Sequence, residues 1–122
     1  MLFAYEALKR FVREDFERFY AMGFDGNQIL PAVLNEYEHG EGFCQAENIC
    51  IRLFLVLNYW EKGLPAAALM ETLVPLLADE RCEGIQAALG SGYAQYVSDL
   101  DVIQNLAQQV GISLKSEITQ KE

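Results

Sequence analysis

One short segment of this chain combines residue types that could hold a metal ion. Glu36 and His39 are three positions apart, a spacing that lets both side chains reach one ion from a single helix in di-metal carboxylate proteins. Those sites need a second such pair and further carboxylates, whereas His39 is the only histidine in the sequence. The segment therefore favours a histidine that faces solvent or a partner, and we expect no metal and no other cofactor.

The sequence also lacks the pattern of a nucleophilic or nucleotide-dependent enzyme. Its serines lie outside any nucleophile-elbow motif, and its two Gly-x-Gly segments lack the third glycine of a dinucleotide site. Cys44, five residues from His39, fits a buried structural thiol better than a catalytic thiolate. Carboxylate pairs such as Asp99 with Asp101 arise by chance among eighteen acids. We therefore expect a protein that is not an enzyme.

The distribution of charge is the strongest functional feature. The chain has eighteen acids against nine bases, a formal charge of −9, and residues 19–51 contain no Lys or Arg at all. The acids of this stretch, which give it a charge of −5, are Asp25, Glu36, Glu38, Glu41 and Glu47. Such charge repels phosphate backbones and anionic headgroups and attracts basic surfaces. We expect no direct contact with nucleic acid or membrane.

Two interpretations of the acidic stretch stay open. Acids keep small proteins in solution, and a solvated face is the ordinary fate of a charge run. These acids, however, lack basic residues four positions away, and aromatic residues are interleaved with them, a combination that suits fast and tight docking onto a basic protein. The predicted partner-binding residues are Asp25, Glu36, Tyr37, Glu38, His39, Glu41, Phe43 and Glu47.

The elements that must position these residues are all predicted to be helices. Apolar residues recur every three or four positions between residues 5 and 20, which predicts a helix ended by Gly23. The apolar positions are Leu8, Phe11, Val12, Phe16, Phe19 and Tyr20. Two acid–base pairs with the favourable i, i+4 spacing are expected on its outer side, namely Glu6 with Arg10 and Glu14 with Arg18.

A second helix is expected from the turn and cap at residues 25–27 to about His39, with Pro31 in its first turn. Gly40 and Gly42 are expected to end this helix in a loop, so that the acidic corner, Glu36 to Phe43, includes this loop. Residues 45–60 are apolar nearly all round, which predicts a central helix covered on several sides. A buried strand is the competing assignment, but the length of the segment and Gly63 as its terminator favour a helix.

Prolines and glycines divide the rest of the chain. Pro65 is expected at a first helical position, and Pro75 is expected to end or kink that helix. The echo of Leu30-Pro31-Ala32 in Leu64-Pro65-Ala66 allows a helical repeat, although prolines at the starts of short helices explain it as well.

Two capped helices are expected after this point. Asp79 is predicted to cap a short helix through Leu89, and Ser91 to cap a last helix up to Gly111. The apolar positions of that last helix are Tyr93, Tyr96, Val97, Leu100, Ile103, Leu106 and Val110.

These elements predict an all-α fold, a compact bundle of five to six helices with a central apolar helix. Residues 1–111 form one domain, and residues 112–122 a loosely ordered tail. Cys44, Cys50 and Cys82 are odd in number and lack a Cys-x-x-Cys spacing, so small buried thiols are expected. The sequence has no apolar run of about 20 residues and no signal-like start, so we expect a cytoplasmic protein.

In size, acidity, helical content and absence of catalytic motifs, the whole chain resembles the small cytoplasmic immunity proteins of bacterial toxin systems, such as contact-dependent growth inhibition. The helix from Phe11 to Tyr20 and the corner from Glu36 to Phe43 look like parts of such a protein. The resemblance implies a non-enzymatic protein that neutralises a cognate toxin domain, often a basic nuclease, by covering its active site with acidic residues. The alternative is a self-associating helical scaffold or regulatory subunit, in which Tyr93, Tyr96 and the central apolar helix supply a homodimer contact.

Overall fold

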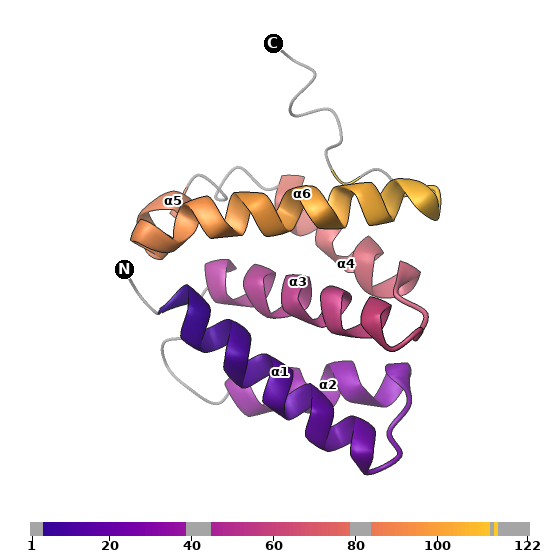
Figure 1. Cartoon of the computed structure of the whole chain (residues 1–122). Helices are drawn as coiled ribbons and strands as arrows, with labels where there is room; N and C mark the ends of the chain where they lie inside the picture. The colour runs from indigo at the N-terminus through magenta and orange to yellow at the C-terminus, as the bar shows by residue number, and fades with distance from the viewer. Residues whose placement is uncertain (1–3, 39–44, 79–83, 113, 115–122) are drawn as a thin grey trace.

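A computed structural model of the chain describes residues 4–38, 45–78, 84–112 and 114 (Figure 1). The helices are α1 (Tyr5–Ala21), α2 (Gly26–Glu38), α3 (Gln45–Glu61), α4 (Ala67–Ala78), α5 (Gly84–Leu89) and α6 (Tyr93–Gln109), with the 3-10 turn η2 (Gly90–Gly92) before α6. None of the described residues forms a strand. The predicted all-α class and the predicted number of five to six helices are confirmed.

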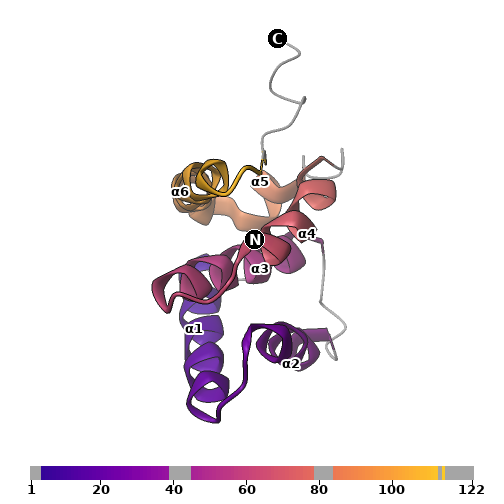
Figure 2. The same ribbon diagram turned by 90° about the vertical axis from the view of Figure 1, so that its right-hand side faces the viewer.

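The helix α3 touches most of the other elements. It packs against α1, α2, α4, α5 and α6. Both views place α1 and α2 on one side of α3, and α5 and α6 on the opposite side (Figure 1, Figure 2). Most of its side chains are buried. The thiol of Cys50 is among them, and its predicted burial is confirmed. Cys44 and Cys82 lie outside the described residues.

The helix α1 begins and ends close to where the sequence predicted. Its buried residues are Tyr5, Leu8, Val12, Phe16 and Phe19. The apolar stripe is narrower than predicted, because Phe11 and Tyr20 are exposed. Gly23 adopts a φ of 91°, which a residue with a Cβ rarely reaches, and the amide of Phe24 donates to the carbonyl of Phe19 at 3.1 Å. This hydrogen bond closes the helix in a Schellman motif.

Pro31 and Pro75 lie inside helices, which corrects the predicted place of Pro31 and the alternative that Pro75 ends its helix. Pro31 is the sixth residue of α2 instead of part of its first turn, and α4 continues past Pro75 to Ala78. A proline deprives the carbonyl four residues earlier of its donor. Those carbonyls belong to Asn27 and Glu71, both exposed like the prolines themselves, so water can replace the lost donor. The helices therefore tolerate these prolines.

Pro65 occupies a different position from Pro31. It precedes α4, which begins at Ala67, whereas Pro31 lies within α2. The predicted first helical position for Pro65 is therefore two residues too early, a normal uncertainty at helix ends. The echo of three residues does not correspond to a repeated structural unit.

The start of α6 differs from the prediction. Ser91 lies in the 3-10 turn and is exposed, and no side chain of the described residues caps α6 at Gly92. A Cβ added at Gly92 would lie 2.6 Å from the Cβ of Tyr5, so the backbone here approaches α1 directly. The predicted cap of α5, Asp79, lies outside the described residues, and α5 begins at Gly84.

The packed part of the chain continues beyond α6. Gly111 has a φ of 81°, and the amide of Ile112 donates to the carbonyl of Ala107 at 2.8 Å. Ile112 packs against the core, and Leu114 is buried. These two residues fall within the predicted tail, whose residues 115–122 lie outside the described part of the chain.

Candidate partner-binding site

The structure describes the side chains of four of the eight residues predicted to bind a partner. They are Asp25, Glu36, Tyr37 and Glu47. Glu38 is the last residue of α2, but its side chain is outside the described part, as are His39, Glu41 and Phe43. The predicted site can therefore be built from its α2 and α3 sides.

Tyr37 brings acids from three helices together. Its hydroxyl donates to Oδ2 of Asp15 in α1 at 3.2 Å, and the ring is half-buried against the core. Burial raises the pKa of the Tyr37 phenol, and the neighbouring charge of Asp15 raises it further. The charges of Glu36 and Glu47 act in the same direction. We call Asp15, Glu36 and Glu47 around Tyr37 the acidic cluster.

Arg18 partly compensates this cluster. Its Nη2 donates to Oδ1 of Asp15 at 3.0 Å and to Oε2 of Glu36 at 3.1 Å. Glu36 was expected to lack a basic partner, and the structure corrects this, because the base comes from another helix. Three acids against one base still leave the cluster with a formal surplus of two negative charges.

The two acid–base pairs predicted along α1 are not among its interactions. Arg18 turns to Asp15 and Glu36 instead of Glu14, and the guanidinium of Arg10 lies 5.2 Å from the centre of the Phe11 ring. Pairs on a helix surface contribute only about 0.2–0.5 kcal/mol. Contacts with a neighbouring helix or ring therefore easily replace them.

Asp25, predicted to bind a partner, caps the start of α2. Its Oδ1 accepts from the amide of Gln28 at 3.0 Å, and its own amide donates to Oε1 of Gln28 at 2.9 Å. This reciprocal pair is a capping box at the start of α2. The predicted cap is confirmed, and the carboxylate already has a partner within the fold.

Asp99 is an important residue that the sequence analysis missed. It is only 7% exposed, although it was grouped with Asp101 as a chance pair of acids. The residues of α6 that are buried are Tyr96, Asp99, Ile103 and Ala107, whereas Val97 and Val110 of the predicted stripe are exposed. The spacing from Tyr96 to Ile103 was the available signal, because Asp99 falls between them on the same helical face.

Three donors surround the carboxylate of Asp99. Oδ2 accepts from the hydroxyl of Tyr5 at 2.7 Å and from Nζ of Lys9 at 3.0 Å, and Oδ1 accepts from Nε2 of Gln95 at 3.2 Å. Burial, together with the hydrogen bond to Asp99, raises the pKa of Tyr5. The phenol therefore stays protonated at neutral pH, the opposite of what a general base requires. We read this group as a clamp that joins α1 to α6.

The predicted homodimer contact also changes. Tyr96 is 5% exposed, and its ring lies 6.4 Å from that of Tyr5, edge to face. Tyr93 is half-buried, with its ring 5.9 Å from that of Tyr96. Tyr96 is therefore a packing residue and is not available to a second copy.

The described residues offer no metal-binding cluster and no membrane-spanning helix. Across the described ranges, no group of three or more His, Cys, Asp or Glu residues could hold a metal ion. None of the described helices is at once long enough and apolar enough to cross a membrane. Comparisons with protein-family models, with curated proteins and with solved structures gave no match.

Proposed function

We propose that this chain is a non-enzymatic immunity or inhibitor protein that binds a basic partner, such as a cognate toxin domain, through the acidic cluster and the corner that follows it. The observation that supports this function best is the gathering of Asp15, Glu36 and Glu47 around Tyr37, with Arg18 as the partner base. As the resemblance implies, we expect it to act in the cytoplasm, and its net negative charge leads us to expect no direct contact with nucleic acid.

The pairing of the remaining charges supports the same proposal. Four bases, Lys9, Arg13, Arg18 and Lys62, already form ion pairs with acids. The acids that form no ion pair with another described residue are Glu6, Glu14, Asp25, Glu47, Glu71 and Asp101. Most bases of the described residues are thus paired with acids of the same fold. The acids without an ionic partner leave an excess of negative charge on its surface. Such a surface speeds encounter with a basic protein.

The test is affinity capture from the native host, followed by mass spectrometry of the retained proteins. The first variant, the corner variant, changes Glu36, Glu38, Glu41 and Glu47 to Gln. The control variant carries Glu14→Gln, Glu71→Gln, Asp101→Asn and Glu117→Gln. Each variant has a formal charge of −9 + 4 = −5, so only the location of the removed charges differs.

We expect the parent and the control variant to retain one basic protein and the corner variant to lose it. Both variants should keep their helical circular dichroism. Equal retention by all three baits would show that the acidic corner is not the interface. Equal loss from both variants would show that total charge, and not this surface, attracts the partner.

A self-associating helical subunit is the second candidate function. Exposed apolar side chains on α1, α3 and α6 favour it, among them Phe11, Trp60 and Val102. With Tyr96 buried, a homodimer contact would have to use such residues instead. Sedimentation equilibrium of the parent protein tests this function, because a scaffold subunit should run as a dimer or larger.

A further inference from the structure

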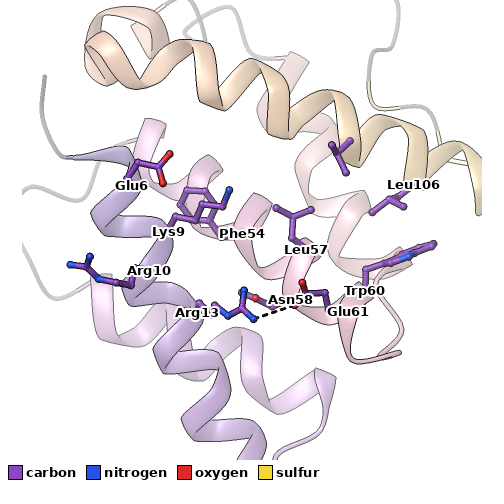
Figure 3. A pocket seen from close by; sticks show the side chains of 11 residues that line it. Glu6, Lys9, Arg10, Arg13, Phe54, Leu57, Asn58, Trp60, Glu61 and Leu106 are labelled. Atoms are coloured by element: carbon purple, nitrogen blue, oxygen red, sulfur yellow. Dashed lines mark ion pairs between the residues drawn. The ribbon is translucent and has the colours of Figure 1, made fainter.

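A groove with an apolar floor lies between α1 and α6 (Figure 3). Its volume is about 560 Å³, and it shares no residue with the acidic cluster. Phe54 and Leu57 of α3 form the floor, and Val102 and Leu106 of α6 form one wall. Trp60 closes the far end of the floor (Figure 3).

The groove exists because α1 and α6 are joined at one end only. Tyr5 and Lys9 bind Asp99, and the Gly92 backbone lies against Tyr5, so both helices start close together. From there they diverge along α3 (Figure 1). Most of the second half of α3 is still buried, but Leu57 and Trp60 stay partly exposed between the two helices.

The wall formed by α1 concentrates positive charge in an acidic chain. Three of the nine bases, Lys9, Arg10 and Arg13, line the groove, against two of the eighteen acids, Glu6 and Glu61. Lys9 is bound to Asp99, which leaves Arg10 and Arg13 to meet a ligand, and Glu6 and Glu61 balance their charge when no ligand is bound.

Both arginines can change partners easily. Arg13 lies 3.7 Å from Glu61, and more than half of each side chain is exposed, so this ion pair is weak and replaceable. Arg10 is paired with the Phe11 ring. Guanidinium groups bind carboxylates through two parallel hydrogen bonds, which makes them suited to capture acidic side chains.

We propose that this groove binds an acidic amphipathic α-helix of a partner protein. Its apolar side chains would cover Leu57, Trp60 and Val102, and its carboxylates would pair with Arg10 and Arg13. Two helical walls and an apolar floor are the arrangement in which proteins commonly bind a helix. The groove is only partly enclosed, so a small molecule would stay partly in water, unlike in ordinary ligand pockets. This surface goes beyond the proposed function, since it takes a ligand of the opposite charge.

The test starts from a displayed library of peptides of about 16 residues, roughly four helical turns. Apolar residues other than Trp are fixed at helical spacing, and the remaining positions are random. After selection on the full chain, Trp60 reports binding, because it is the only tryptophan in the sequence. We expect the selected peptides to carry Asp or Glu beside the apolar positions, and to shift the Trp60 emission to shorter wavelengths.

Two exposed valines on α6 provide matched variants. Val102 is 45% exposed and lines the groove, whereas Val97 is 41% exposed and does not. We expect Val102→Asp, and separately the pair Arg10→Glu and Arg13→Glu, to weaken binding about tenfold or more, while Val97→Asp leaves it unchanged. Urea midpoints of all variants verify that they are folded.

Five outcomes would overturn the proposal. Four concern the ligand: selection of no peptide, selection of basic peptides, equal binding to the two valine variants, and a shift of Trp60 emission by a fatty acid, sodium laurate, but by no peptide. A parent dimer that Val102→Asp converts to a monomer would also overturn it, because a second copy would then fill the groove.

Discussion

At the scale of single residues, Asp99 carries the most consequential polar contact between α1 and α6. Its carboxylate is buried, and the hydroxyl of Tyr5 and the ammonium of Lys9 both depend on it as an acceptor. Tyr5 also packs edge-on against Phe54, with ring centres 5.0 Å apart. A change at Asp99 therefore leaves a buried hydroxyl without an acceptor in the middle of apolar packing.

The first prediction concerns this carboxylate. Asp99→Leu should lower the free energy of unfolding by about 3 kcal/mol, because it strands both donors. Asp99→Asn should cost less, about 1–2 kcal/mol, because its amide oxygen can still accept from Tyr5. Urea unfolding followed by circular dichroism measures both values.

Asp101→Asn is the matched control, since Asp101 is exposed on the same helix. It should change stability by less than about 0.5 kcal/mol. If Asp99→Leu were as mild as this control, Asp99 would not act as a clamp.

At the scale of the elements, α1 connects the bundle. Among the described residues, every ion pair involves it: Lys9 reaches α6, Arg13 reaches α3, and Arg18 reaches α2. Its first turn also receives the start of α6, where Gly92 lies directly against Tyr5. The start of α6 is therefore packed against Tyr5 of α1 and has no side-chain cap among the described residues.

The second prediction compares two neighbouring residues in this turn. Gly92→Ala should lower stability by about 1–3 kcal/mol, because the new Cβ would lie 2.6 Å from the Cβ of Tyr5 and force the helices apart. Ser91→Ala should change it by less than about 0.5 kcal/mol. Thermal unfolding of both variants against the parent measures the difference.

A loss of about 1 kcal/mol in Ser91→Ala would instead restore Ser91 as the cap of α6. An unchanged melting temperature in Gly92→Ala would mean that α1 and α6 can separate slightly without cost.

At the scale of the whole molecule, three tyrosine hydroxyls tie helices to one another. Tyr5 joins α1 to α6, and Tyr37 joins α2 to α1. The hydroxyl of Tyr59 in α3 donates to the carbonyl of Gly26 at the start of α2, at 2.5 Å. Burial raises the pKa of each phenol, in the case of Tyr59 to about 12.

The third prediction follows from these raised pKa values. Above pH 10, the ordinary tyrosine value, the unfolded chain releases phenol protons that the folded protein still holds. Stability is therefore fully present below pH 10 and falls as the pH rises towards the folded values. The slope of the unfolding free energy against pH should approach about 1.4 kcal/mol per pH unit for each tyrosine. For the three together it should approach about 4 kcal/mol per pH unit.

Urea unfolding between pH 9 and about 11.5 measures this slope, and absorbance at alkaline pH follows the ionisation of the phenols. Tyr59→Phe should lower stability at neutral pH by about 1 kcal/mol through the lost hydrogen bond. It should also reduce the slope of stability against alkaline pH by the share of one tyrosine, about 1.4 kcal/mol per pH unit. An unchanged slope in this variant would show that Tyr59 ionises equally in both states.

The sequence by itself determined the helical class and several helix ends. Apolar periodicity and the glycines after α1, α3 and α6 are local signals, and Gly23, Gly63 and Gly111 indeed have positive φ angles. The Asp25 cap was equally readable, because its partner Gln28 is three residues away. Such features depend on neighbouring residues alone, so the tertiary structure did not need to be known.

Only the tertiary structure decided which charges meet. Glu36 finds Arg18 on another helix, and Asp99 becomes a buried acceptor for residues about ninety positions earlier. The groove beside Trp60 likewise arises because α1 and α6 diverge after their shared start. The physical reason is that surface charge pairs contribute only tenths of a kcal/mol. The packing of the helices therefore chooses their partners, and local spacing does not.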